Sequence, residues 1–519
     1  MKNVNGLAMR DCLLLGLSAL AGMKCGGGAQ PVGSAGAGGT GLPATSGSGG
    51  AGITAGTGSG MAGSVTAGGM PGAAGSVGTA GTAGTVGTAG AGTAGSGGAV
   101  AQANCTFTIP AATTSAKIAT VGVVEFSTDL AGLSSAQIEF GLDTNYGMVA
   151  PVDVAAANHH TLLLGMKQRK TYHFRVVATG SAGQCQSMDQ TITAGSLPNG
   201  FPTIDVETKT QNKAELYGGF LLTGAYVQSG GGSGSPAYIV DQDGDVVWAF
   251  NVGSDVTGAH MSNDGKYMWI NSAQVPEGKT NVHRVSMDGL TDEDLSTQFK
   301  GLNHTLQVLP DESVAFFAYS SNGCDDVKLR HPDGTVDTLY NSGTATGGKA
   351  CHCNAIAYSE SDKSLVVSEL ESNKYFKVKI ADKSLVWVLG GTAPNDFTGD
   401  GSTWSRQHGV HVLAADKLLF FNNGALGSSG SLAIELLLDL SAKTAKKAWT
   451  YQSAPGISND IMGDVQRLKN GNTIIAYSTK GVLHEVNAQS TLLQSWSWPI
   501  GGAFGYISKR KSLYGPPEK

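Results

Sequence analysis

The chain has 519 residues, 76 of them glycine, and a formal net charge of −6. This length is more than one domain usually needs. The mild negative charge comes without a basic stripe, which argues against a nucleic-acid partner.

Residues 1–25 have the pattern of an export signal peptide. Basic residues flank the apolar run CLLLGLSALAGM, which is too short to span a bilayer, and Ala19-Leu20-Ala21 forms an A-x-A cleavage site. The alternative is a lipid anchor at Cys25, although Met23-Lys24 stands where a lipobox has small residues. We expect an exported protein (periplasmic, outer-envelope or extracellular) with no transmembrane helix.

Residues 26–103 consist almost entirely of Gly, Ala, Thr and Ser. Such a segment has no large side chains to bury, so nothing offsets its conformational entropy. The composition predicts a disordered linker.

Five cysteines follow the linker. Cys105 and Cys185 bracket the first folded segment and are expected to pair, whereas Cys324 could pair with either Cys351 or Cys353. The Cys-His-Cys run at 351–353 does not have a zinc-binding spacing, so we expect no metal site there.

Residues 104–197 contain short alternating runs separated by turns, which predicts an all-β segment. The run TYHFRVVA at 171–178 resembles the penultimate strand of fibronectin type III domains. This resemblance implies a small β-sandwich that acts as a spacer or as a docking surface for an envelope partner.

Residues 200–519 show a longer repeat of paired hairpins, which turn on dipeptides such as Asp264-Gly265 and Asn470-Gly471. A spacing of roughly 40 to 60 residues is typical of a four-stranded propeller blade. The repeat predicts a six-bladed β-propeller. The units close near Trp248, Phe299, Tyr340, Trp387, Trp449 and Trp496.

Polar residues begin the candidate first strand of five units. These residues are His260, His304, His352, His408 and Asp464. Equivalent positions of a propeller converge at one mouth of its channel, so we expect a polar site there; the alternative is a repeat signature that locks each strand to its neighbour. Arg406 lies two positions before His408 and is expected on the same strand face.

Imidazoles beside a guanidinium suit a tetrahedral oxyanion, because imidazole titrates near neutrality and Arg offers fixed donors. A metal site is the weaker alternative, since Asp464 is the one carboxylate at an equivalent position. The run at 396–401 has Gln407 rather than Glu at its twelfth position, so it matches a calcium loop poorly.

The motif order over about residues 205–515 resembles the bacterial arylsulfotransferase family. The motifs are W-x-L-G-G at 387–391, Q-H at 407–408, N-N-G at 422–424, H-x-N at 352–354 and N-G-N-T at 470–473. The resemblance implies a six-bladed propeller that moves a sulfuryl group from an aryl sulfate to a phenol, without a nucleotide donor or cofactor.

The same resemblance implies roles for individual residues. His408 would attack the donor and become a sulfohistidine. His352 and Asn354 would bind sulfate oxygens or protonate the leaving phenolate, and either His260 or His304 would supply the remaining oxyanion contact.

Two departures from the family pattern matter for function. Leu370 stands where the family has an Arg, and Asn422 replaces the Asp of D-N-G. Arg406 is a candidate replacement for the lost guanidinium. The competing hypothesis is a catalytically inactive propeller that binds glycans, peptides or an envelope partner; a calcium- or quinone-dependent enzyme lacks its ligand residues.

Overall fold

The fold is all-β in the part of the chain that the computed structural model describes, which is residues 102–198, 204–226, 234–272, 280–348, 351–498 and 503–517. The predicted export signal lies outside these residues, and so does the predicted linker except for its last two residues, Gln102 and Ala103; the Ala103 amide donates to the Gln184 carbonyl at 2.8 Å. No helix in these ranges has the length and apolar character to cross a membrane. The helical segments are α2 (Ser342–Thr346) and the 3₁₀ turns η1 (Ala157–His159), η2 (Lys213–Glu215), η3 (Asp400–Ser402) and η4 (Ser478–Lys480).

The first ten strands form three antiparallel sheets, with orders β10-β8-β5-β6 (β9 also pairing with β8), β2-β3-β7 and β1-β4. The predicted strand at 171–178 falls within β8, and its alternate residues Tyr172, Phe174 and Val176 are buried in one apolar core with Val124 of β3 and Leu163 of β7. The strands are β1 (Phe107–Thr108), β2 (Thr113–Thr114), β3 (Gly122–Val124), β4 (Ser127–Thr128), β5 (Ser135–Gly141), β6 (Met148–Val152), β7 (Thr161–Leu163), β8 (Thr171–Gly180), β9 (Gly183–Gln186) and β10 (Gln190–Thr193).

Both disulfide expectations are resolved. Cys105 pairs with Cys185, as predicted, and Cys324 pairs with Cys351. Cys353 is a buried free thiol.

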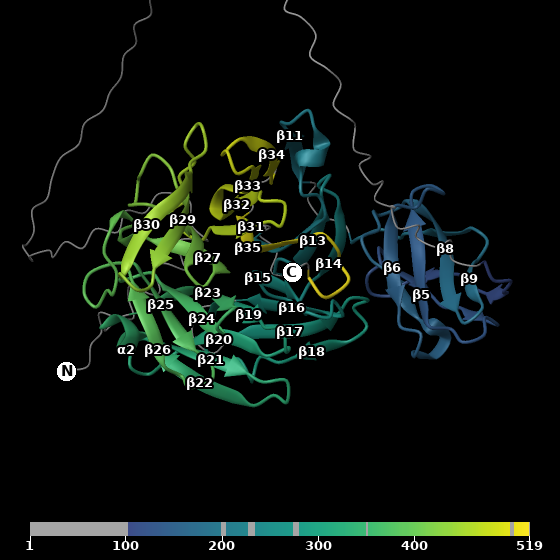
Figure 1. The fold of residues 1–519 in the computed structure, drawn as a ribbon, viewed down its shortest axis with the longest axis horizontal. Helices are drawn as coiled ribbons and strands as arrows, with labels where there is room; N and C mark the ends of the chain where they lie inside the picture. Colours follow the sequence, from purple (N-terminus) through teal and green to yellow (C-terminus); the bar gives the residue numbers. More distant parts are fainter. Residues whose placement is uncertain are drawn as a thin grey trace, which may run out of the picture. The chain divides into compact units, whose positions relative to one another are not determined.

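The remaining strands form six antiparallel sheets, five of four strands and one of five (Figure 1). In strand order, the sheets are β14 (Val246–Phe250), β13 (Ala237–Asp241), β12 (Phe220–Tyr226) and β35 (Ala503–Arg510); β15 (Gly258–Met261), β16 (Tyr267–Ser272), β17 (Asn281–Ser286) and β18 (Asp292–Asp294); β19 (Leu302–Val308), β20 (Val314–Tyr319), β21 (Asp325–Arg330) and β22 (Val336–Asn341); β23 (Cys353–Ser359), β24 (Ser364–Glu369), β25 (Lys374–Lys379) and β26 (Leu385–Leu389); β27 (Gln407–Ala414), β28 (Lys417–Asn422), β29 (Leu432–Asp439) and β30 (Thr444–Tyr451); and β11 (Asp205–Thr208), β34 (Leu492–Ser497), β33 (Val482–Val486), β32 (Thr473–Tyr477) and β31 (Asp464–Arg467).

One edge strand of each sheet contacts the corresponding strand of the next sheet in a closed series, β35, β15, β19, β23, β27, β31 and back to β35 (Figure 1). The two ends of the segment complete sheets built mostly from distant sequence. β11 pairs with β34, and β35 pairs with β12. In a closed series of this kind, the edges of the sheets are short and are covered by the neighbouring sheets.

Most of the predicted aromatic positions lie in the strand at the other edge of a sheet. Trp248 and Trp387 are buried in the edge strands β14 and β26, whereas Trp496 is buried in β34, which pairs with the edge strand β11. Phe299 is also buried, but it follows β18 instead of lying in it. The turns at Asp264-Gly265 and Asn470-Gly471 join β15 to β16 and β31 to β32, as the hairpin pattern predicted.

Hydrogen bonds and ion pairs join residues 162–167 to the six-sheet segment. The Tyr514 hydroxyl donates to the Leu162 carbonyl and accepts from the Leu164 amide, both at 2.9 Å. Lys167 forms ion pairs with Asp243 and Asp245 at the turn between β13 and β14, at 2.8 and 2.7 Å.

Candidate active site

Three of the four predicted strand-start histidines meet. His304 of β19 and His408 of β27 have ring centroids 6.4 Å apart, and the His304 and His352 rings are 4.7 Å apart. His352 immediately precedes β23, so the cluster draws on three successive sheets. His408 is 1% exposed and His352 8%, which makes this a largely dry group of imidazoles.

In the described part of the chain, no hydrogen bond or ring contact joins His260 to these three rings. Its Nε2 lies 3.1 Å from Thr305 Oγ1, and its side chain lines a cavity that none of the other three lines. The sequence pattern predicted that the four histidines are equivalent. In the structure, His304, His352 and His408 form one cluster, whereas His260 lines a separate cavity.

Irregular strand pairing explains the difference. The register of β19 shifts between Leu302 and Leu306, that of β23 between Cys353 and Ala355, and that of β27 between His408 and His411. Such bulges bend a strand and re-aim its side chains. β15 pairs with β16 without a shift, so His260 keeps the regular orientation.

Arg406 does not share a strand face with His408 in the way that residue spacing predicted. β27 begins at Gln407, and Arg406 has a left-handed backbone with φ of 57°. The Arg406 amide donates to Asn373 Oδ1 at 2.5 Å, and its carbonyl accepts from the Asn423 amide at 3.1 Å. The simple alternation of a strand therefore fails at this position, although Arg406 still lies close enough for its charge to act on His408.

His304 has a similar left-handed backbone, with φ of 58°. Its carbonyl accepts hydrogen bonds from Thr257 Oγ1 at 2.8 Å and Asn271 Nδ2 at 2.9 Å. A non-glycine residue in this region costs on the order of 1–3 kcal/mol and persists when its surroundings over-determine it. The two buried donors hold this conformation.

Asn423 determines which nitrogen of His408 carries the proton. Asn423 Nδ2 faces the carbonyls of Asn459 and Met462, the latter at 2.8 Å, and carbonyls can only accept. The amide oxygen must therefore be the atom 2.7 Å from His408 Nδ1. His408 consequently donates its Nδ1–H, and in the neutral ring Nε2 carries the lone pair.

The surroundings of His408 keep the ring neutral. Burial lowers its pKa to about 4, and the positive charge of Arg406 acts in the same direction, while hydrogen bonds to Asn423 and to the Arg406 backbone oppose the shift. A neutral ring with a lone pair at Nε2 is a competent nucleophile at neutral pH.

His304 and His352 form a coupled pair. His304 Nδ1 faces Asn303 Oδ1 at 2.5 Å, whose orientation follows because Asn303 Nδ2 donates to the Cys353 carbonyl. His304 Nε2 is then an acceptor, so His352 donates across the 3.1 Å between the two Nε2 atoms. Burial and the nearby His352 and His408 rings hold the pKa of His304 well below its usual value, so the pair carries at most one positive charge.

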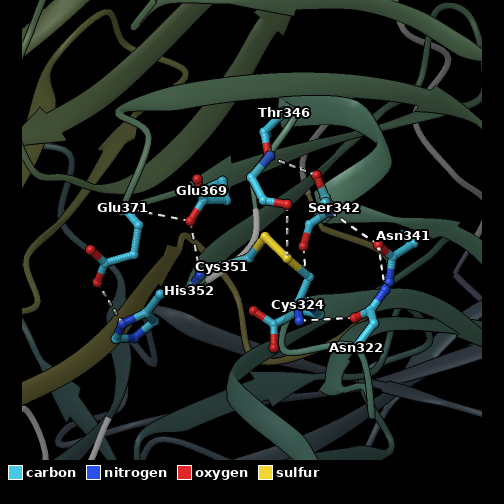
Figure 2. The surroundings of a disulfide bond; sticks show 12 residues. Asn322, Cys324, Asn341, Ser342, Thr346, Cys351, His352, Glu369 and Glu371 are labelled. Atoms are coloured by element: carbon cyan, nitrogen blue, oxygen red, sulfur yellow. Dashed lines mark hydrogen bonds and ion pairs between the residues drawn. A yellow bond between two sulfur atoms is a disulfide. The ribbon is translucent and has the colours of Figure 1, made fainter. Parts of the chain in front are cut away.

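The main chain at His352 is clamped from several sides (Figure 2). The His352 amide donates to buried Glu369 Oε1 at 2.8 Å, and Nδ1 lies 3.9 Å from Glu371 Oε1, within ion-pair distance when the ring is protonated. The Cys324–Cys351 disulfide fixes the preceding residue. Leu370 is buried, and its amide donates to the His352 carbonyl at 3.0 Å, so the residue at the family's Arg position supports the backbone and supplies no cation.

Asn354 is fully buried beside this cluster. Its Nδ2 donates to the Gln407 carbonyl at 2.8 Å, and its carbonyl accepts from the Tyr506 hydroxyl. Its Oδ1 has no hydrogen-bond partner within the described ranges. Asn354 therefore offers one unused N–H and one unused acceptor to a ligand.

Asp464, the fifth strand-start residue, has a structural use for both oxygens. Oδ1 accepts from the Val465 amide and Oδ2 from the Ile507 amide, each at 2.9 Å, which ties β31 to β35. Burial raises the pKa of Asp464 to about 7. Gly409 (φ of 57°) lies so close to Asp464 that a Cβ at this position would be 2.4 Å from Asp464 Oδ1, so the residue after His408 needs to be glycine.

The described part of the chain contains no group of three or more His, Cys, Asp or Glu that could hold a metal ion.

Sequence reasoning did not identify Asn303, Asn423 or Glu371, which orient or face the ring nitrogens. One signal was present, because Asn423 is the middle residue of the N-N-G motif. The preceding residue, Asn422, lies at the position where the family has Asp, and its Oδ1 accepts from the Ser405 amide at 3.1 Å. The side-chain oxygen of an Asn accepts this hydrogen bond as the carboxylate of an Asp would. The replacement of the family's Asp by Asn422 therefore leaves the histidine site intact.

The fold and site describe an all-β protein with a buried histidine cluster. The family model of arylsulfotransferase (ASST) matches residues 223–497, more than half of the chain. The chain therefore belongs to the arylsulfotransferase family.

Other comparisons are more distant. No curated protein matches the sequence. TolB from Acinetobacter baumannii is similar at 13% identity and a TM-score of 0.40, covering 66% of this chain and 81% of its own. The Cps50 (Swd1) β-propeller domain of Myceliophteria thermophila is similar at 10% identity and a TM-score of 0.36, covering 57% and 90%. Nothing about this chain is inferred from likenesses at this level.

The buried histidines make stability depend on pH. Burial lowers the pKa values of His260, His408, His411 and His484 to about 4 each. The unfolded chain, whose histidines titrate near 6.5, then binds more protons than the folded chain between pH 6.5 and 4, so the free energy of unfolding falls as pH falls through this window. Asp464 opposes the trend, because its raised pKa makes the folded state bind a proton more readily.

We expect denaturant midpoints to decrease steadily from pH 7 to pH 5, and His411→Gln to flatten that slope. Urea unfolding followed by tryptophan fluorescence measures both. A midpoint that increases between pH 7 and pH 5 would contradict the neutral state of these rings.

Proposed function

We propose that the six sheets are the blades of a six-bladed β-propeller and that its histidine cluster transfers sulfuryl groups from an aryl sulfate to a phenol. The observation that carries the proposal is the orientation of His408, whose Nδ1–H is bound to Asn423 so that Nε2 is free to attack. Membership of the arylsulfotransferase family supports the substrate class.

In the first step, His408 Nε2 attacks the sulfur of the donor. The S–N bond forms as the bond from sulfur to the aryl oxygen breaks, and a sulfohistidine results. The leaving phenolate takes a proton from the singly protonated His304–His352 pair, whose Nε2 atoms are 3.1 Å apart, and the pair becomes neutral. The hydrogen bond from Nδ1–H to Asn423 stabilises the positive charge that develops on the His408 ring.

In the second step, an acceptor phenol returns the proton to the His304–His352 pair. Its oxygen attacks the sulfur, the S–N bond breaks, and His408 regains its lone pair. Because the pair acts first as acid and then as base, it needs to carry only one exchangeable proton between turns.

Arg406 is proposed to replace the guanidinium that the family has at the position of Leu370. Its charge acts on His408, and its Nε is buried without a hydrogen-bond partner in the described ranges. Guanidinium donors suit the oxygens of a transferring sulfuryl group. Asn354 Nδ2 is a second candidate donor, whereas His260 lies beside another cavity and is assigned no catalytic role.

The remaining assignments follow the sequence. We propose an exported protein, supported by two disulfides, which persist in oxidising compartments. Residues 104–197 are proposed to be a fibronectin type III-like sandwich, supported by antiparallel sheets that share one core. A lipid anchor at Cys25 stays a prediction.

Turnover of 4-nitrophenyl sulfate tests the proposed reaction. We expect release of nitrophenol that rises when phenol is added as acceptor. His408→Ala and Arg406→Ala should each reduce kcat/KM by at least about 100-fold, since one loses the nucleophile and the other an oxyanion donor. Lys379→Gln, an exposed residue of β25, is the matched control. Absence of release with several aryl sulfates would favour the inactive binding module, and a fully active Arg406→Ala would overturn the role of that residue.

Asn423 is proposed as a positioning residue, which a pair of neighbouring variants can test. Asn423→Leu removes the acceptor for His408 Nδ1–H, so kcat should fall by about 100-fold or more while KM for the donor changes less than about threefold. Asn422→Asp keeps an acceptor for the Ser405 amide and should retain activity.

A purely structural role for Asn423 predicts another result. Both kcat and the fraction of folded protein would then fall together in Asn423→Leu, with the surviving fraction turning over at the normal rate. Active-site titration beside thermal unfolding separates these cases.

A further inference from the structure

A second polar space lies apart from the three clustered histidines. It is a cavity of about 850 Å³, a volume typical of sites for drug-sized ligands. It is lined by residues of the strands that form the closed series of sheets and of the turns that follow them. Examples are His411 of β27, Gln466 of β31 and Arg510 of β35. His304, His352 and His408 do not line it.

Arg510 is a buried cation in the wall of this cavity, and most of its side-chain donors lack a hydrogen-bond partner in the described part of the chain. It is only 7% exposed, yet its Nε and Nη2 have no hydrogen-bond partner in the described part of the chain. Nη1 makes one long contact, to the Ser262 carbonyl at 3.4 Å. Burial lowers the pKa of Arg510 to about 10, as expected for a desolvated cation that lacks an anion.

No nearby carboxylate in the described part of the chain neutralises the positive charge of Arg510. Arg467 is paired with Glu435 at 2.6 Å, and Lys509 with Glu485 at 3.1 Å, so these two cations are already neutralised. The cavity is also lined by three exposed lysines for which no ion pair occurs within the described ranges. They are Lys417, Lys469 and Lys511.

The hydrogen-bonding groups of the wall favour an acceptor-only ligand. His411 Nδ1 accepts from the Arg467 amide at 2.9 Å, which leaves Nε2–H as the donor of that ring. The Nε–Nη2 edge of an Arg matches two oxygens of an oxyanion. Further donors around it suit a group with a third oxygen, as sulfate and phosphate esters have and carboxylates do not.

We propose that this cavity is a second binding site, which takes an organic sulfate or phosphate ester whose oxyanion rests on the Nε–Nη2 edge of Arg510. The exposed lysines attract the anion, and the cavity volume accommodates its organic body. The inference does not depend on sulfuryl transfer at His408, and a failure of either proposal leaves the other intact.

Calorimetric titration of the full chain with 2-naphthyl phosphate tests the site. We expect saturable binding that Arg510→Gln weakens by at least about tenfold, because a buried charged contact is lost. His408→Ala should bind the probe as the unchanged protein does. Binding that persists in Arg510→Gln, or that disappears in His408→Ala, would place the ligand elsewhere and overturn the proposal, as would no binding at all.

A second variant guards against misfolding of Arg510→Gln. Lys417→Gln with Lys469→Gln changes only exposed residues and should weaken binding severalfold and reduce its salt dependence, whereas Lys379→Gln should change neither. An unchanged affinity in the double variant would also contradict the site. Comparing 2-naphthyl sulfate with the phosphate in His408→Ala, where no turnover occurs, then identifies which ester binds more tightly.

Discussion

The arrangement of the site depends on one buried amide. Asn423 is held by two carbonyls that can only accept, so its oxygen must face His408 Nδ1. That single orientation selects the tautomer of His408 and leaves Nε2 as a nucleophile. The same residue donates its backbone amide to the Arg406 carbonyl, and so joins the nucleophile to Arg406, whose positive charge acts on the His408 ring. Loss of this residue would affect the chemistry of the ring and the position of the charge together.

The three histidines converge because the strands β19, β23 and β27 each have a shift in pairing register near their histidine. Bulges in β19, β23 and β27, together with left-handed backbones at His304 and Arg406, turn side chains away from the regular alternation. Buried donors such as Asn271 stabilise these conformations. The closed series of sheets provides the rigid frame that such local strain requires. Where pairing is regular, as at His260, the side chain lines the cavity assigned to a second ligand.

Repeat spacing and turn dipeptides were enough to predict the all-β segment, its hairpins and the strand starts, because alternation and Gly-containing turns are local signals. The pairing of Cys105 with Cys185 followed from their positions around one segment. The bulges could not be predicted, since they depend on which residues face one another across strands. For this reason the sequence placed Arg406 on the face of His408 and made His260 equivalent to His304. The roles of Asn423 and Arg510 could not be predicted either, because they depend on partners that are distant in sequence or missing.

The most direct test of the account is to locate a covalent intermediate. The full chain would be mixed with 4-nitrophenyl sulfate in the absence of acceptor, quenched within one turnover and mapped by peptide mass spectrometry. The account predicts an added mass of about 80 Da on the peptide that contains His408, lost when phenol is added and absent from His408→Ala. A sulfuryl group on His304 or His352, or turnover without any adduct, would contradict the assignment of His408 as the nucleophile.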